Sequence, residues 1–237
     1  HNQSTFVAAG PVAEDQKNIF LFIFWVAVAV MVPVEGAIIY FATCYRRTRR
    51  TEGLPEQIHG NTAVEIAWTI APAIVLVAIA IPTVNLIYNQ GQGPSGGITP
   101  ENPVEIRVIG HQWWWEFRYP EYDFVTTNEL HIPVSHPGGT WPSFLVLQSQ
   151  DVIHSFWVPQ LSGKIDLVPN RTNHLWMDPL EPGVYVGQCA EYCGTQHANM
   201  LLRVFVHEPE EFERWARSQK ASARLVDDPV EGRAIFQ

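Results

Sequence analysis

The residues from Ile66 to Tyr88 form a run of 23 amino acids without a charged side chain. As an α-helix such a run is about 35 Å long, which exceeds the roughly 30 Å hydrocarbon core of a membrane. A second run, from Asn18 to Tyr45, contains Glu35 as its single charged residue. The alternative is a pair of core helices in a soluble bundle, but neither run has the polar stripe that such helices carry. The sequence therefore predicts transmembrane helices at residues 18–45 and 65–88.

Basic residues set the orientation of this helical hairpin. Four arginines directly follow the first run: Arg46, Arg47, Arg49 and Arg50. Since positively charged loops stay in the cytoplasm, residues 46–64 are predicted to form a cytoplasmic loop. Residues 1–17 and everything after the second helix are then expected on the outer, periplasmic side of the cell (plasma) inner membrane.

The rest of the chain has the pattern of a β-domain. A Gly- and Pro-rich stretch at 89–102 is typical of a linker. Beyond it, short runs rich in β-branched and aromatic residues alternate with turn residues, as in VEIRVIG, FLVLQ, GVYVGQ and MLLRVFVH. This spacing predicts an antiparallel sandwich or barrel at residues 103–207. The acids of Glu208-Pro209-Glu210-Glu211 favour the start of a short helix to about Lys220, within a C-terminal segment of residues 208–237.

Charge and cysteine content exclude two classes of protein. The formal net charge of −9 argues against nucleic acid as a partner. Three cysteines, Cys44, Cys189 and Cys193, cannot all pair, and a disulfide framework would need an even-numbered and denser set.

A dense cluster of metal ligands lies between two of the strand-like runs. The segment Q-C-A-E-Y-C-G-T-Q-H-A-N-M contains Cys189, Cys193, His197 and Met200, and His154 lies upstream in D-V-I-H-S-F. Thiolate, thioether and imidazole ligands together favour copper over hard cations. A single blue-copper ion uses one cysteine, two histidines and a weak axial methionine. The second cysteine predicts two copper ions bridged by both sulfurs, with one imidazole on each and with Met200 and the Glu191 carbonyl as weak axial ligands.

Three alternatives stay open at this point. A structural zinc ion held by the two cysteines and the two histidines would leave Met200 unused. A disulfide between Cys189 and Cys193 would leave the histidines and Met200 unused. The ligand spacing also fits one face of a helix, with the cluster as packing, although Gly187 and Gly194 disfavour a helix there.

The motifs resemble subunit II of the haem–copper cytochrome c oxidases. The resemblance rests on C-x-E-x-C-G-x-x-H-x-x-M, on D-V-I-H-S-F and G-H-Q-W-W-W-E-F upstream, and on V-E-I-A-W-T-I-A-P at the second helix. It extends over about residues 4–217 and includes the helical hairpin with its outward β-domain. It implies a cupredoxin-like domain with a dinuclear centre called copper A. Its ligands would be His154, Cys189, Cys193, His197, Met200 and the backbone oxygen of Glu191.

The resemblance also implies roles for residues outside the copper set. Trp113 resembles the residue through which electrons enter from the donor, and Glu65 resembles the glutamate at the mouth of a proton channel into subunit I. The Glu191 side chain resembles a ligand of a magnesium or manganese ion shared with subunit I. Asp166 and Arg171 match a segment near that ion and that interface.

Two further interpretations come from the residues themselves. Strand alternation places Trp114 opposite Trp113 and Trp115, and core packing is the better interpretation for Trp114. Three acids that are close in sequence to Trp113 or His154 are candidates for a dock for a basic cytochrome. They are Glu121, Asp123 and Asp151.

The function that the resemblance implies is electron transfer in respiration. The chain would accept electrons from a c-type cytochrome (soluble, membrane-bound or fused) at copper A and pass them to a haem of subunit I. There oxygen is reduced to water and protons are pumped, with other oxidase subunits as further partners. A membrane-tethered copper carrier would not need the tryptophan run or Glu65. A quinol oxidase subunit would lack the ligand set, and a nitrous oxide reductase needs a large second domain.

The end of the chain gives one more expectation. Residues 231–237 resemble the opening helix of a c-type cytochrome, which some subunits II of this family carry fused at this point. A haem-attachment Cys-x-x-Cys-His does not occur in the sequence. The segment is expected either to lead into such a cytochrome or to be a frayed chain end.

Overall fold

The structure is a computed structural model that describes residues 3–46, 53, 57, 59–91, 93, 103–135 and 142–220. It divides into two compact units, one of residues Val12–Ile98 and one of His1–Pro11 with Thr99–Gln237. Arg47, Arg49 and Arg50, most of the predicted linker (residues 92 and 94–102) and the tail after Lys220 lie outside the described residues. The expectations about orientation and about a fused cytochrome depend on these residues and stay predictions.

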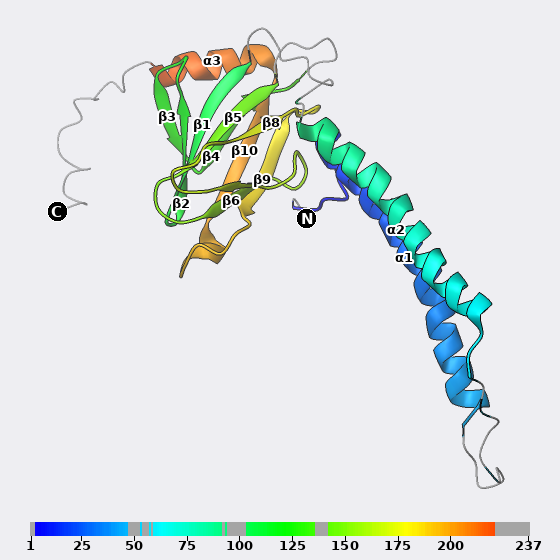
Figure 1. The fold of residues 1–237 in the computed structure, drawn as a ribbon. Coiled ribbons are helices and arrows are strands. Elements are labelled where there is room, and N and C mark those ends of the chain that lie inside the picture. Colours follow the sequence, from blue (N-terminus) through cyan, green and yellow to red (C-terminus); the bar gives the residue numbers. More distant parts are fainter. Residues whose placement is uncertain are drawn as a thin grey trace. The chain divides into compact units, whose positions relative to one another are not determined.

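Helices α1 (Pro11–Cys44) and α2 (Thr62–Gly91) make up most of the first unit (Figure 1). At 1.5 Å per residue they are about 51 and 45 Å long, and both are apolar enough to cross a membrane. α1 begins before the predicted Asn18 because a proline suits the first helical position and the polar turn after it continues the helix. α2 begins before the predicted residue 65 because Asn61 Oδ1 accepts two backbone N–H groups of its first turn, at 3.1 and 3.3 Å.

The segment ahead of α1 is part of the β-domain. In this N-terminal strap, defined as Ser4–Gly10, the Ala9 N–H donates to the Gln160 carbonyl at 2.7 Å and the Ala9 carbonyl accepts the Leu180 N–H at 2.9 Å. The Gln160 side chain donates to the Val7 carbonyl at 3.1 Å. Because the strap and the β-domain are bonded together, both ends of the helical hairpin lie on one side of a membrane, as two crossings require.

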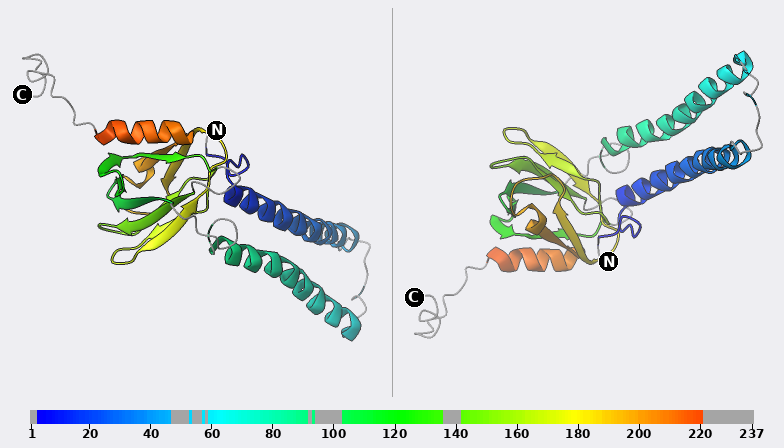
Figure 2. Two further views of the ribbon diagram at one scale, coloured as in Figure 1. Left: turned by 90° about the horizontal axis from the view of Figure 1, so that it is seen from above. Right: turned by 90° about the horizontal axis from the view of Figure 1, so that it is seen from below.

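The described part of the second unit contains two five-stranded sheets (Figures 1 and 2). Their orders are β3-β2-β1-β5-β8 and β4-β10-β9-β6-β7. The strands are β1 (Val104–His111), β2 (Trp114–Tyr119), β3 (Phe124–Thr127), β4 (Glu129–Pro133), β5 (Ser143–Ser149), β6 (His154–Trp157), β7 (Ile165–Leu167), β8 (Asn173–Met177), β9 (Gly183–Cys189) and β10 (Leu201–His207). The expected sandwich with a short C-terminal helix is confirmed. The expectation of a purely antiparallel arrangement is wrong, because β1 pairs with β5, and β10 with β4, in parallel. Side-chain alternation predicts strands but carries no information about their direction.

The core lies between the two sheets. Alternate residues of β1, β2 and β5 point inward, among them Ile106, Phe117 and Leu145, and they meet Phe156 and Val204 of the other sheet; all five are fully buried. Removing each such side chain from water stabilises the fold by roughly 2 kcal/mol. This packing gives the site described below a rigid support.

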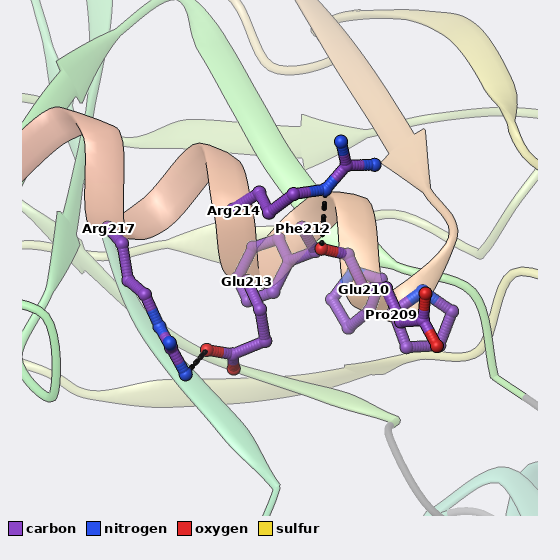
Figure 3. A pocket seen from close by; sticks show the side chains of 7 residues that line it. Pro209, Glu210, Phe212, Glu213, Arg214 and Arg217 are labelled. Atoms are coloured by element: carbon purple, nitrogen blue, oxygen red, sulfur yellow. Dashed lines mark hydrogen bonds and ion pairs between the residues drawn. The ribbon is translucent and has the colours of Figure 1, made fainter.

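Helix α3 (Pro209–Lys220) lies against the β-domain at the end that carries β4 and the end of β10 (Figure 1). Phe212 and Ala216 are buried on its inner face. A hollow of about 360 Å³ beside it is lined by Pro133, Phe212 and the charged residues Glu210, Glu213, Arg214 and Arg217 of the helix, with Pro209 (Figure 3). In Figure 1 the loop between β9 and β10 is at the opposite end of the domain, so this hollow is remote from the candidate ligands.

Two histidines are enclosed beneath α3. His131 Nδ1 lies 2.8 Å from His207 Nε2, and the His131 ring stacks on Trp215 with 3.9 Å between ring centroids. Burial and the neighbouring His207 lower the pKa of His131 to about 4. Burial also lowers the pKa of His207. The folded protein therefore holds this pair neutral in a pH range where the imidazoles of an unfolded chain are protonated.

Acid is expected to destabilise the β-domain through this pair. Between about pH 6.5 and pH 4 the unfolded chain binds more protons than the folded one, so the free energy of unfolding falls as the pH is lowered. From pH 7 to pH 4.5 the loss due to His131 should be on the order of 2 to 3 kcal/mol. His131→Phe keeps the stacked ring and should make this pH dependence smaller. Urea unfolding of the full chain in detergent at both pH values, with exposed His174→Phe as control, would measure it. An equal pH dependence in all three proteins would contradict the expectation.

Candidate metal centre

The candidate ligands come from neighbouring strands of one sheet. β9 ends at Cys189, β10 begins at Leu201, and the loop between them carries the other ligands of the cluster. β6 begins at His154 and pairs with β9, so that Phe156 lies opposite Cys189. Because residues two apart on a strand point to one face, His154 projects to the same side of the sheet as Cys189.

The structure brings all six predicted ligands together. The sulfurs of Cys189 and Cys193 lie 3.8 Å apart. His154 Nδ1 lies 3.9 Å from the Cys189 sulfur, and His197 Nδ1 lies 3.5 Å from the Cys193 sulfur. The Met200 sulfur is 3.7 Å from Cys193 Sγ, and the Glu191 carbonyl is 3.2 Å from Cys189 Sγ. Each thiol therefore has its own imidazole and its own weaker candidate ligand beside it.

Backbone hydrogen bonds hold the ligand loop in shape. Cys189 N–H donates to the Met200 carbonyl at 3.0 Å, which closes the loop at its base. Ala190 N–H donates to the Ser155 carbonyl at 2.9 Å, which attaches the loop to β6. A short 3-10 turn, η2 (His197–Asn199), presents His197 to the thiols. These bonds define the shape of the loop through its own backbone.

The two thiols differ in their tendency to ionise. Burial opposes ionisation of Cys189, but the contact with His154 and hydrogen bonds with backbone groups outweigh it and lower the pKa of this thiol. Burial and repulsion by Cys189 raise the pKa of Cys193. Ionisation of one thiol therefore disfavours ionisation of the other. A bound cation would neutralise the second thiolate and so favour loss of its proton.

The donor set fits copper. His154, Cys189 and Cys193 are buried, and their ligand atoms lie within 4.8 Å of one another. A zinc site built on these groups would leave the fully buried Met200 sulfur unused. The disulfide alternative is not realised, because both cysteines are free. The helix alternative is wrong, because η2 is the single helical turn of residues 188–200, which the structure describes throughout.

Trp113 lies in the turn between β1 and β2, next to the centre. Its indole N–H donates to the Cys193 carbonyl at 3.2 Å, and Gln112 Nε2 donates to the same oxygen at 2.7 Å. The assignment of Trp114 to the core is wrong. The turn includes Trp113, so strand alternation begins only at Trp114, and Trp115 is the fully buried ring. Trp114 stacks on the His111 ring outside the core, at 4.2 Å.

The three acids proposed as a cytochrome dock do not share one surface. Asp151 lies at the centre, where its carboxylate contacts His154 at 2.8 Å. β2 begins near the centre and runs away from it, and Glu121 and Asp123 follow its far end. Tyr122, which lies between them, donates a hydrogen bond to Glu213 of α3. They therefore lie at the opposite end of the domain. Their distance from Trp113 in sequence is short, but a whole strand separates them.

The residues predicted for the proton channel, the magnesium ion and the subunit interface lie in α2, on β7 and in the turn after it, and in the ligand loop. Glu65 is in the first turn of α2. Asp166 is exposed on β7, opposite Ser155 of β6, and Arg171 is exposed in the turn that follows. The residue Glu191 is exposed apart from its inward carbonyl contact. The proton-channel, magnesium and interface roles stay predictions.

Two glycines and one glutamine belong to the centre and were missed in the sequence. A Cβ on Gly110 would lie 2.8 Å from His154 Cδ2, and one on Gly194, whose φ is +120°, would lie 3.0 Å from Gln112 Nε2. Both positions need the absence of a side chain. A glycine inside a strand-like run is an indication of such close approach, and VEIRVIG contains one.

Two protein-family models match the chain. The transmembrane domain of cytochrome c oxidase subunit II matches residues 2–86, and its periplasmic domain matches residues 140–206. A solved structure, the periplasmic domain of subunit II of cytochrome oxidase from Bradyrhizobium japonicum, is similar at 30% identity with a TM-score of 0.47. That similarity covers 52% of this chain and 97% of the solved one.

Curated relatives are similar over most of the chain. Cytochrome c oxidase subunit 2 of Alkalihalophilus pseudofirmus is 41% identical over 201 residues, which cover 81% of this chain but only 56% of the relative. The chain thus spans little more than half the length of that protein. The probable cytochrome c oxidase subunit 2 of Rickettsia bellii is 32% identical over 232 residues, which cover 91% of this chain and 83% of the relative.

Proposed function

Because the chain belongs to the cytochrome c oxidase subunit II family, we propose that it carries electrons from a c-type cytochrome to a haem of oxidase subunit I. The electrons would pass through a dinuclear copper centre, and subunit I would reduce oxygen to water and pump protons. One observation carries the proposal: two buried thiols lie 3.8 Å apart, and each has its own imidazole.

The residues divide the binding of two copper ions between them. The thiolates of Cys189 and Cys193 and the imidazoles of His154 and His197 would hold the ions, with the Met200 thioether and the Glu191 carbonyl as weaker ligands. Bound there, the ions supply a one-electron couple. The side chains keep water from the thiolates and hold the ligands in place, because both sulfurs are buried and the loop is closed by backbone bonds. Such a site passes electrons without making or breaking bonds to a substrate.

The two apolar helices support the proposal of a membrane-bound electron carrier. α1 and α2 would anchor the chain in the plasma membrane beside subunit I, with the β-domain on the outer side, where a cytochrome can reach it. Glu65 would lie at the mouth of a proton channel of subunit I, and the Glu191 side chain, with Asp166 and Arg171 near by, would face a shared magnesium or manganese ion.

Metal content tests the proposal. Full-length chain loaded with copper in detergent is expected to hold two copper ions. Its EPR spectrum in the partly oxidised form should be that of one unpaired electron shared by two nuclei. Retention of one copper ion per chain, or displacement of copper by zinc, would overturn the dinuclear centre.

Trp113 is expected to be the residue through which electrons reach the centre. Its indole N–H donates to the carbonyl oxygen of Cys193, which is itself a candidate ligand residue. Trp113→Ala should slow reduction of the centre by a c-type cytochrome about tenfold or more, equal to about 1.4 kcal/mol of barrier. Trp114→Ala is the matched control, because Trp114 stacks on His111 and not on the ligand loop. Stopped-flow measurement should find the copper spectrum unchanged in both variants; equal rates in both would contradict the role of Trp113.

A further inference from the structure

The two oxygens of the Asp151 carboxylate serve different parts of the metal centre. Oδ1 lies 2.8 Å from His154 Nε2 and also accepts the Val152 N–H at 2.6 Å. Oδ2 accepts the Gln112 N–H at 2.7 Å, across 39 residues of sequence. One short side chain therefore joins a candidate ligand to the turn that carries Trp113.

The bond to His154 decides which nitrogen of that ring can bind a metal. A carboxylate beside Nε2 favours the tautomer with its proton on Nε2, which leaves the Nδ1 lone pair free. Nδ1 is the atom that faces the Cys189 sulfur. The ring is fully buried, with Gly110 close behind it, so it has little room to turn.

The bond to Gln112 fixes the other side of the centre. The Gln112 N–H is held by Asp151, while the side chains of Gln112 and Trp113 both donate to the Cys193 carbonyl. A continuous path of hydrogen bonds thus runs from His154 through Asp151 and the turn to Cys193. The path therefore links His154 to Cys193 through protein groups alone.

We propose that Asp151 is a positioning residue that fixes His154 and the Trp113 turn in one common geometry. This inference rests on the proposed function of the site. The competing assignment is an acid that attracts the donor cytochrome, since the Asp151 side chain is 31% exposed. The two assignments differ in a measurable way, because a docking acid acts on the donor and a positioning acid acts on the copper site.

Asp151→Asn separates these assignments. Its amide has one accepting oxygen and one donating nitrogen, so it cannot accept both from His154 and from Gln112. Asp123→Asn is the matched control: it makes the same chemical change and removes the same charge at the opposite end of the domain. Asp123 has a φ of 56°, which asparagine tolerates well. Gln112→Ala removes a side-chain bond to Cys193 and leaves the Asp151 contact with His154 intact.

Copper affinity of the full chain in detergent is the first measurement, by competition with a copper chelator. Asp151→Asn is expected to bind copper about 10- to 100-fold more weakly, the usual effect of losing a group that orients a ligand histidine. Its EPR spectrum should also differ from that of the wild type. Asp123→Asn should keep wild-type affinity.

The rate of reduction of the copper-loaded centre is the second measurement. It should be made with a c-type cytochrome and with hexaammineruthenium(II), a small donor that needs no docking surface. Asp151→Asn and Gln112→Ala are expected to react more slowly than Asp123→Asn with both donors. An Asp151→Asn chain that equals Asp123→Asn in copper affinity, spectrum and rate with the small donor would overturn the inference. A wild-type chain that binds no pair of copper ions would instead overturn the proposed function.

Discussion

Cys193→Ser is expected to remove the dinuclear copper centre while the β-domain stays folded. Its sulfur lies within 3.8 Å of three other candidate donors, on Cys189, His197 and Met200, so the whole arrangement converges on it. A serine oxygen is a harder and less acidic donor that does not bridge copper in this way. Copper content should fall from about two ions per chain to one or none, and the spectrum of a shared electron should disappear.

Cys44→Ser is the control for this substitution. It makes the same change on an exposed cysteine at the end of α1 and should keep both copper ions. Met200→Leu gives a further comparison, because a weak axial ligand should affect the reduction potential more than the stoichiometry. Copper analysis, EPR and a redox titration of the three full-length variants would decide the matter. A Cys193→Ser chain that keeps two ions and the shared-electron spectrum would contradict the assignment of Cys193 as a bridging ligand.

Gly110→Ala is expected to have a comparable effect from outside the ligand set. The new Cβ would lie 2.8 Å from Cδ2 and 3.1 Å from Cγ of His154. The strand cannot move away, because Gly110 is paired with Trp115 on one side and Ser149 on the other. The imidazole must therefore leave the position in which its Nδ1 faces the Cys189 sulfur. We expect a destabilisation of about 1 to 3 kcal/mol from overpacking, and copper binding at least about tenfold weaker.

Gly36→Ala is a suitable control for the glycine substitution. Its added Cβ meets nothing within 4 Å, so neither copper affinity nor the stability of the β-domain should change. Chelator competition and urea unfolding of both variants would measure the two effects. Wild-type copper affinity in Gly110→Ala would mean that the His154 ring has more room than the packing indicates.

The candidate ligands were predictable from sequence because most of them are close together in the chain. Five of the six candidate ligand residues lie within the segment from Cys189 to Met200, and soft donors at this spacing have few other uses. The groups that orient the ligands were not predictable. Gln112 and Asp151 are 39 residues apart and meet only because β1 and β5 pair in parallel.

The wrong expectations have a similar cause. Strand alternation gave the incorrect inward tryptophan because the sequence does not mark where the turn after His111 ends and β2 begins. The three acids of the predicted dock do not form one surface, because a strand separates Glu121 and Asp123 from the end of the domain that carries Asp151. The predicted helices agree with α1 and α2 over their apolar residues. The helix ends differ because they depend on local caps such as Asn61.

The N-terminal strap has a consequence for the order in which this protein is assembled. During synthesis the strap emerges before the β-domain, and its partner Gln160 follows 153 residues after Val7, when both membrane segments have already been made. Contacts between such distant residues form late and slowly. A chain in which one helix fails to insert would leave Ala9 and Gln160 on opposite faces of the membrane, where the bonds between them cannot form. The bonds between the strap and the β-domain are therefore incompatible with a chain in which a single helix has crossed the membrane.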